Sequence, residues 1–198
     1  GSGTIGWAAP HTGALALEAD IGDLSAFDLV ARELTGLGAD SALGGGAMQG
    51  RGRAELHLSG ALGALTVAGT AAVDTVQWLQ YRAENLRGRL TYQTGDSTMD
   101  TAVSADSLGV GTLRFHGLQA AAAGHRDAFS WTTVVRGGGG ARLGAGGRLA
   151  RETGGTSVHA DSLSLDLLGR GWRLALPFDA RIGESVIALD TVRLTTGD

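Results

Sequence analysis

The sequence contains no cysteine and no lysine, and each absence excludes a class of chemistry. Without cysteine there is no disulfide, no thiolate nucleophile and no cysteine-ligated zinc site. Without lysine there is no Schiff-base lysine, no P-loop lysine and no Ser-x-x-Lys nucleophile. All 16 basic residues are arginine. The net charge is −4, and acidic and basic residues are interspersed along the chain, which argues against a nucleic-acid-binding surface.

Aromatic residues and proline are also scarce, whereas glycine is abundant. The chain is 5% aromatic and has 2 prolines and 34 glycines, yet 43% of its residues are hydrophobic. A core would be built mainly from Leu, Val and Ala, which favours a shallow sheet or an open groove over a thick globule. No apolar run approaches the about 20 residues that a membrane-spanning helix needs. The first residues, Gly1-Ser2-Gly3, have no signal-peptide pattern after them and are typical of an excised fragment.

Alternation of apolar and polar residues is clearest near the C-terminus. There, every second residue forms one apolar face of an extended chain: Trp172, Leu174, Leu176 and Phe178. Pro177 cannot donate to a ladder, so this strand is expected at an edge or to end near there. A second strand is predicted over residues 186–194, and its two halves share a face only if a bulge lies near Asp190-Thr191.

The same alternation predicts about twelve strands along the chain. They cover residues 15–21, 53–58, 65–73, 76–81, 86–93, 99–105, 113–118, 129–135, 142–150, 159–167, 172–178 and 186–194. Turns are expected at Ser59-Gly60, Gly88 and Gly95-Asp96. Apolar residues at helical spacing predict one short helix over residues 26–34, capped by Ser25 and followed by a Gly-rich loop up to residue 50.

The fold class predicted is therefore all-β: an elongated, curved, mainly antiparallel sheet with one short helix near residues 26–34. Residues 1–50 hold the first strand, the helix and the Gly-rich loop, and residues 51–198 form the repetitive sheet of the same elongated domain. A weak internal repeat supports this organisation, because Ala105-Asp106-Ser107-Leu108 recurs as Ala160-Asp161-Ser162-Leu163.

No pattern of catalytic or metal-binding residues is found. The histidines are dispersed, and three of them, His57, His116 and His159, stand opposite Leu in predicted strands, where a solvent-facing side chain is expected. Glu18 and Asp20 share the polar face of a strand, which predicts a solvated surface and not a carboxylate pair. There is no Gly-x-Ser-x-Gly elbow. We expect no enzyme activity, no cofactor and no metal.

Several features together resemble one known family. They are the short Leu/Val strands, the Ala-Asp-Ser-Leu steps, the strand pair over residues 172–194, and the entry Ala-Asp-x-Gly-Asp-Leu-Ser at residues 19–25. This pattern is similar to that of TamB and its AsmA-like relatives, a family that includes the inner-membrane component of the bacterial translocation and assembly module. The resemblance is clearest over residues 65–198, where it lies in the order and spacing of the strands.

The resemblance implies a β-taco, which is a long sheet folded lengthwise around an apolar groove. It also implies a periplasmic protein anchored to the inner membrane, with phospholipid as cargo and an Omp85-type outer-membrane barrel as partner. This chain lacks the anchor and the aromatic-terminated segment expected next to the barrel, so it resembles an internal segment. The groove is expected to be lined by eight residues: Trp172, Leu174, Leu176, Phe178, Phe129, Trp131, Phe115 and Leu113.

Two other functions remain open at this point. The sheet edge could pair with a strand of an outer-membrane or autotransporter protein, as in β-augmentation. A closed sandwich, as in a surface adhesin domain, is the third interpretation, and it would show no continuous groove. An open apolar face would favour the lipid conduit, because soluble proteins rarely expose a long apolar surface that binds nothing.

Overall fold

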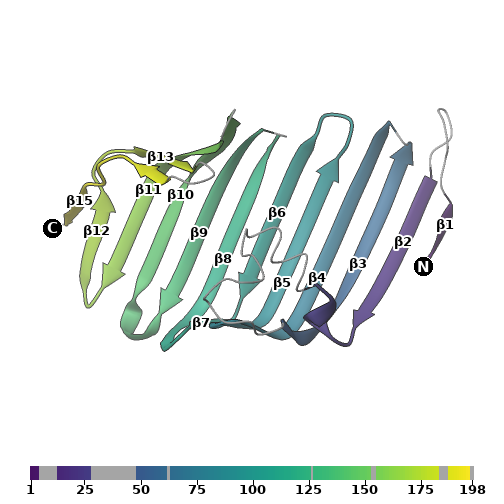
Figure 1. Ribbon diagram of the computed structural model, residues 1–198, viewed down its shortest axis with the longest axis horizontal. Helices are drawn as coiled ribbons and strands as arrows, with labels where there is room; N and C mark the ends of the chain where they lie inside the picture. The colour runs from purple at the N-terminus through teal and green to yellow at the C-terminus, as the bar shows by residue number, and fades with distance from the viewer. Residues whose placement is uncertain are drawn as a thin grey trace.

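A computed structural model describes residues 1–4, 13–27, 48–61, 63–125, 127–152, 155–182 and 187–196. Its strands form one 15-stranded sheet in which every pairing is antiparallel. Figure 1 shows this single layer running from β1 near the N-terminus to β12 and β15 near the C-terminus. The all-β, curved-sheet class predicted from the sequence is confirmed.

Most strands pair with their neighbours in the sequence, so the sheet is largely a meander. The main path runs β1-β2-β3-β4-β5-β6-β8-β9-β10-β11-β12-β15, while β7 pairs with β5 and β8, and β13 pairs with β11 and β14. The strands are β1 (Ser2–Thr4), β2 (Gly13–Ile21), β3 (Gln49–Ala61), β4 (Ala64–Trp78), β5 (Tyr81–Gln93), β6 (Thr98–Ala105), β7 (Ser107–Val110), β8 (Leu113–His125), β9 (Ala128–Gly137), β10 (Arg142–Glu152), β11 (Gly155–Leu167), β12 (Arg170–Leu174), β13 (Phe178–Ile182), β14 (Ile187–Leu189) and β15 (Leu194–Thr196).

The pairing register divides the side chains between two faces, because directly opposite residues of neighbouring strands point to the same side. In β3, Leu56 and Leu58 point to one side, whereas Glu55 and His57 are exposed on the other. This division continues through the neighbouring strands. The sheet therefore has one apolar and one polar face, as the alternation in the sequence predicts.

A first crease crosses the sheet where several strands carry an extra residue. Asp74 of β4 has no partner in β3, His116 of β8 has none in β9, and Asp106 separates β6 from β7. Asn85 of β5 lies on the same line with a left-handed φ of 51°, and its side-chain amide donates to the Asp106 carboxylate at 2.9 Å. Such extra residues are β-bulges, which bend strands and increase their twist.

A second crease lies in the C-terminal half. Asp161 of β11 is an extra residue relative to β10, and on the other side of β11 the partner changes at the same level from β12 to β13. The gap between β12 and β13 contains Pro177, which has no N–H to donate to a ladder. The repeated tetrapeptide falls on both bends: residues 105–108 on the first crease and residues 160–163 on the second.

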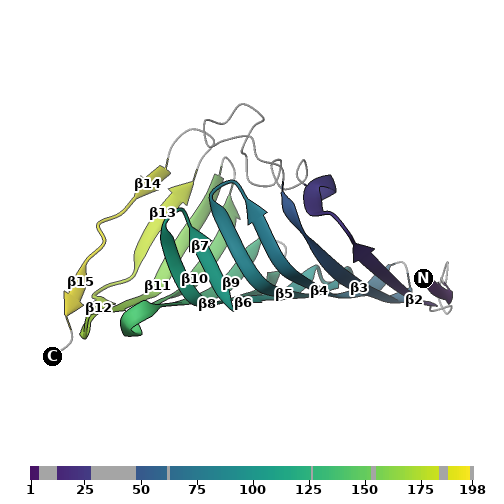
Figure 2. The ribbon, with the colours of Figure 1, turned by 90° about the horizontal axis from the view of Figure 1, so that it is seen from below.

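Beyond each crease the strands leave the plane of the sheet and form a wall. The N-terminal wall comprises residues 49–51, 75–78, 81–84, 107–110 and 113–115, and the C-terminal wall comprises residues 147–152, 155–160, 178–182 and 187–189. Figure 2 shows both walls rising on the same side of the sheet. They stand at opposite ends of the strands, with β7 at the lower and β13 at the upper end in Figure 1.

The most buried side chains lie in the creases. Among the described residues, those classed as buried and hydrophobic are Leu24, Ala83, Ala105 and Ala160. The three alanines lie next to the bends: Ala105 and Ala160 directly precede Asp106 and Asp161, and Ala83 precedes Asn85 by two residues. Leu24 belongs to the 3-10 turn η1 (Leu24–Phe27) and packs against the start of β3, where a Cβ on Gly50 would lie 2.8 Å from its Cδ1.

Some predicted boundaries are wrong. The expected strand over residues 76–81 is a hairpin: β4 ends at Trp78 and β5 begins at Tyr81, with Leu79 at a left-handed φ of 55° between them. Ser59-Gly60 and Gly88 lie inside β3 and β5 and are not turns. Glycine therefore misleads as a turn signal in a chain that contains so much of it.

The C-terminal strand pair also differs from its prediction. The segment from Trp172 to Phe178 is interrupted at residues 175–177, and the segment over residues 186–194 consists of β14 and β15 with residues 190–193 between them. A bulge at Asp190 is therefore the wrong interpretation, since β14 and β15 pair with different strands. Of the predicted helix, residues 28–34 lie outside the described residues, and its start belongs to η1.

Candidate functional site: an open apolar face

The apolar face is continuous from β2 to β13. One row of paired residues crosses it without a charged side chain: Leu17, Leu56, Gly69, Leu90, Thr101, Ala122, Trp131, Gly147, Ala160 and Phe178. The adjacent row extends to β14 and is also uncharged: Leu15, Leu58, Val67, Tyr92, Met99, Gly124, Phe129, Leu149, Val158, Ala180 and Leu189. We call this surface, with its continuation onto the two walls, the apolar face.

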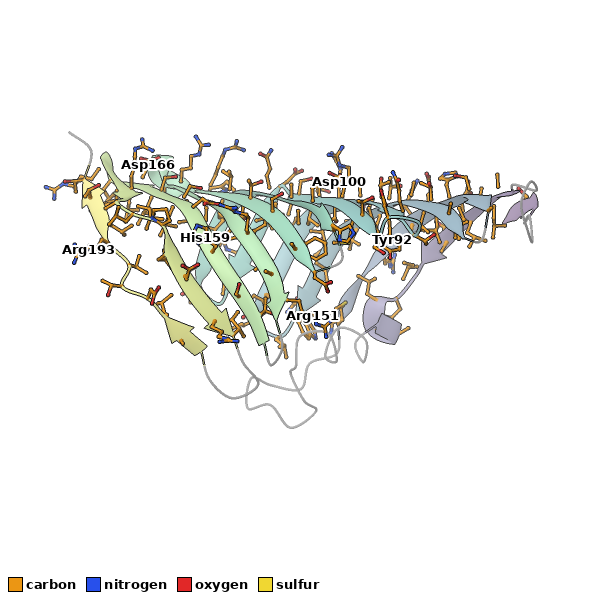
Figure 3. All side chains as sticks on the ribbon, turned by 90° about the horizontal axis from the view of Figure 1, so that it is seen from above. Tyr92, Asp100, Arg151, His159, Asp166 and Arg193 are labelled. Atoms are coloured by element: carbon orange, nitrogen blue, oxygen red, sulfur yellow. The ribbon has the colours of Figure 1, made fainter. Side chains whose placement is uncertain are left out.

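The N-terminal wall continues this surface with two rows. Val76, Ala83, Leu108 and Phe115 pair in the first row, and Trp78, Tyr81, Val110 and Leu113 pair in the second. The walls rise from the apolar side of the sheet: in Figure 3, Tyr92 lies on the side of the walls, whereas Asp100 and Asp166 project from the other side. The apolar face is therefore the concave surface of the molecule.

No second layer closes over this face within the described part of the chain. Leu17, Leu90, Val103 and Leu143, which lie on the floor of the sheet, each keep between 37% and 40% of their surface exposed. None of the described large side chains is fully buried. An exposed apolar surface of this extent is characteristic of a binding surface.

Seven of the eight residues predicted to line a groove lie on this face. Trp172, Leu174 and Phe178 reach it from β12 and β13, Phe129 and Trp131 from β9, and Phe115 and Leu113 from the N-terminal wall. Leu176 lies in the bend between β12 and β13, outside any ladder, and is 63% exposed. Whether any of them contacts lipid stays a prediction.

Sequence reasoning missed the middle of the face. Leu90, Tyr92, Met99 and Val103 lie at its centre. The residues predicted to line the groove belong instead to β8, β9, β12, β13 and the bend between β12 and β13. The alternating pattern of β5 and β6 contained the signal. The register was needed to recognise this signal, because it places the Leu and Val side chains of neighbouring strands side by side in rows across the sheet.

Trp131 has an unusual environment within the apolar face. Its Nε1 is buried and has no hydrogen-bond partner among the residues that the structure describes. Its partner across the ladder is Gly147. A buried, unpaired N–H is destabilising by about 1–3 kcal/mol, so Trp131 contributes less stability than its apolar area alone suggests.

The polar face carries one charged cluster that the sequence did not reveal. The two ring nitrogens of His159 lie 3.1 Å from Asp161 and 2.7 Å from Asp179, and Arg148 lies 3.4 Å from Asp161. His159 was expected to face solvent, yet its ring is only 34% exposed and bridges β11 to β13. The signal in the sequence was the pair His159-x-Asp161, but their contact could not be predicted because Asp161 lies in a bulge.

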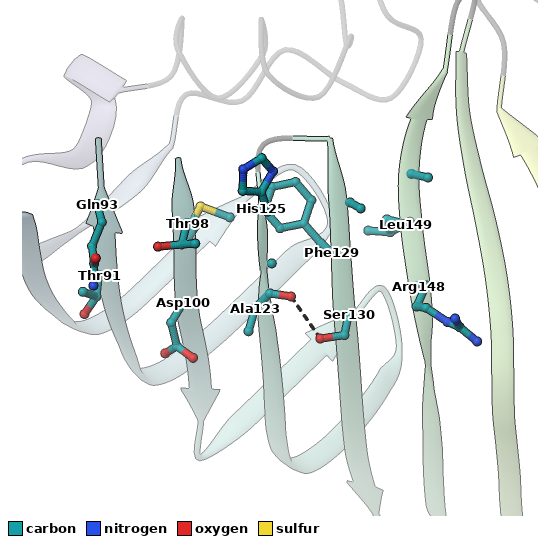
Figure 4. A pocket seen from close by; sticks show the side chains of 14 residues that line it. Thr91, Gln93, Thr98, Asp100, Ala123, His125, Phe129, Ser130, Arg148 and Leu149 are labelled. Atoms are coloured by element: carbon teal, nitrogen blue, oxygen red, sulfur yellow. Dashed lines mark hydrogen bonds between the residues drawn. The ribbon is translucent and has the colours of Figure 1, made fainter. Parts of the chain in front are cut away.

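A shallow hollow of about 670 Å³ lies on the polar face near the ends of β5, β6, β8, β9 and β10. Figure 4 shows its lining, which includes His125, Asp100, Ser130 and Arg148. The Ser130 hydroxyl donates to the Ala123 carbonyl at 3.0 Å, so it is not engaged with a histidine base as a nucleophile requires. The hollow results from small residues between longer polar ones.

Among the described residues, two exposed carboxylates have shifted pKa values: Asp23 directly precedes η1, and Asp96 lies in the turn between β5 and β6. Hydrogen bonds from the backbone N–H and then the hydroxyl of Ser25 lower the pKa of Asp23. The hydroxyl of Thr98 and then its backbone N–H lower the pKa of Asp96. Both groups stabilise turns by accepting local hydrogen bonds, and neither lies on the apolar face.

Within the described ranges, no group of three or more His, Asp or Glu side chains could hold a metal ion. No helix in that part of the chain has the length and hydropathy to cross a bilayer. The described strands form an extended apolar surface, and the charged residues at their paired positions lie on its back and rims. Comparison with known proteins gave no match to a family model, to a curated protein or to a solved structure.

Proposed function

We propose that this chain is a non-enzymatic conduit segment whose apolar face carries phospholipid acyl chains between the two membranes of a bacterial envelope. The observation that carries the proposal is the uncharged, open surface that runs from β2 to β13 between two walls. An acyl chain needs apolar contact and no directional hydrogen bonds. Rows built from Leu, Val, Ala and Gly supply such contact along their whole length.

The resemblance of the strand pattern to TamB and its AsmA-like relatives supports the envelope setting. A periplasmic location, anchoring to the inner membrane and an Omp85-type barrel partner are properties of the longer proteins of that family. We propose the same setting and partner for the longer protein to which this segment would belong. The cargo would move along the floor of the sheet, while head groups would remain near the open side.

A second function is favoured by one observation, the two end strands of the path that the described strands form. β1 and β15 are its terminal strands, and all three residues of β15 are exposed. An extended segment of an outer-membrane or autotransporter protein could add to such an edge by β-augmentation. This scaffold function would use backbone hydrogen bonds and leave the apolar face empty.

Crosslinking separates the two functions. The full chain would be incubated with vesicles that contain a phospholipid with a diazirine in its acyl chain, irradiated, and mapped by mass spectrometry. Adducts should concentrate on apolar-face residues such as Leu90 and Val103. Adducts on the polar face alone, or none at all, would contradict the proposal.

A matched pair of variants tests the same surface. Val103→Glu places a carboxylate in the middle of the apolar face, whereas Ala102→Glu places one on the polar face of the same strand. Val103 is already 37% exposed, so both variants are expected to fold, which circular dichroism and thermal unfolding would verify. Val103→Glu should lose most lipid adducts and Ala102→Glu should keep them. Equal labelling of both folded variants would refute an acyl chain on this face.

A further inference from the structure

At the paired positions of the described strands, the charged side chains on the concave side are all positive. Among the paired positions of the described strands, the charged side chains on the apolar side are Arg151 of β10 and Arg170 of β12. Asp and Glu are absent from these positions, although the chain contains 20 of them. Arg170 begins β12 next to Leu168, which is 86% exposed, so it stands at an outer hairpin. Arg151 lies on the C-terminal wall itself.

Arg151 occupies the rim of that wall. It pairs with Thr156, which pairs with Ile182, and the next row inward is Leu149 with its apolar partners in β11 and β13. Figure 3 shows Arg151 on the side toward which the walls rise. The row of Trp131 and Phe178 lies four residues further in, about 13 Å along an extended strand. The surface therefore changes from cationic at the rim to apolar at the floor.

The guanidinium of Arg151 is available to a ligand. Its side chain is exposed, and it forms no ion pair with another described residue, whereas Arg148, three residues earlier, pairs with Asp161 on the polar face. The backbone N–H of Arg151 donates to the Asp127 carbonyl at 2.8 Å, which fixes its position next to the hairpin between β8 and β9. A guanidinium binds phosphate oxygens through two parallel N–H donors.

We propose that the C-terminal wall selects anionic amphiphiles, with a phosphate head group on Arg151 and the alkyl chain on the apolar rows below it. This inference rests on the proposed lipid function and adds a head-group preference and a residue for it. The paired positions on the concave side of the described strands carry no carboxylate that would repel the phosphate, so their charge is complementary to such a ligand.

The test uses two probes with the same chain, dodecyl phosphate and dodecyl maltoside, titrated below their micelle concentrations into the full chain. Arg151→Gln should weaken binding of dodecyl phosphate about fivefold, which is the upper end for an exposed ion pair. It should leave dodecyl maltoside unchanged. Arg142→Gln, on the polar face of the same strand, is the matched control and should change neither affinity.

Each other outcome has a definite meaning. If Arg151→Gln binds dodecyl phosphate as the parent does, the head-group assignment is overturned while the acyl-chain proposal stands on maltoside binding. If neither amphiphile binds the parent chain, the proposed function fails as well. If inorganic phosphate alone binds as tightly as dodecyl phosphate, the site holds a free anion, and the amphiphile assignment is overturned.

Discussion

An open apolar face predicts a particular dependence of binding on chain length. Complete burial of a methylene group contributes about 0.8 kcal/mol. The sheet contacts an acyl chain from one side only, because none of the described elements lies over the floor of the apolar face and side chains such as Leu90 remain 37% exposed. About half of the full contribution is then expected, or roughly 0.4 kcal/mol per methylene.

This estimate separates an open face from an enclosed tunnel. Four added methylenes, from an octyl to a dodecyl chain, would contribute about 1.6 kcal/mol on an open face, which is roughly a 15-fold gain in affinity. A chain enclosed on all sides would gain about 3.2 kcal/mol, or roughly 200-fold. The octyl, decyl and dodecyl members of one maltoside series, titrated by calorimetry, measure this slope directly.

The two glutamate variants test whether the apolar face produces this gain in affinity per methylene. Val103→Glu should reduce the gain per methylene, and Ala102→Glu on the opposite face should preserve it. An affinity that does not change with chain length would refute the reasoning, because the apolar face would then make no contact with the chain. A slope near the full methylene value would show that another part of the chain closes over the ligand.

Three further predictions concern the creases and turns. Gly147→Ala should lower the free energy of unfolding in urea by about 1–3 kcal/mol, because its Cβ would collide with the His159 carbonyl oxygen; unchanged stability would contradict the close approach. Asn85→Gly should lower the free energy of unfolding by about 1 kcal/mol, because it loses the hydrogen bond to Asp106, whereas Asn85→Val should lower it by about 2–3 kcal/mol, because its branched side chain must also adopt a φ of 51°. Hydrogen bonds from Thr98 lower the pKa of Asp96, so the stability that this carboxylate contributes is present above about pH 4 and is lost as the pH falls through its lowered pKa. Thr98→Ala should therefore flatten the acid limb of stability measured against pH, and an identical limb would argue against this coupling.

The alternation in the sequence predicted most of the strands and the side of the sheet that is apolar. Leu56 and Leu58, or Phe129 and Trp131, lie on the expected side, because a period of two specifies a face whatever the neighbouring strand is. The Ala-rich second half of β8 was missed as strand, since alanine has little strand preference of its own. There, pairing with β6 and β9 on both sides decides the structure.

The walls could not be predicted in the same way. A strand that bends still alternates on each side of the bend, so the segment around Asp74 appeared as two strands and not as one strand with a bulge. The partner change of β11 at Asp161 depends on β12 and β13, which lie later in the sequence. The role of Arg151 could not be predicted for a related reason, because the bend of the C-terminal wall determines which way its side chain points.

Each crease is also recognisable in the sequence, because the alternation of apolar and polar residues shifts by one residue there. Across each bend, successive concave-side residues are spaced by three instead of two: Val73 and Val76, Ala83 and Leu86, Ala105 and Leu108, Phe115 and Leu118, Ala160 and Leu163. Deleting one residue within such a three-residue spacing would restore strict alternation in that strand. On one side of the crease its apolar residues would then point to the opposite face from those of the neighbouring strands. Insertions and deletions at a crease are therefore tolerable only when adjoining strands change together, so each crease constrains all the strands that cross it.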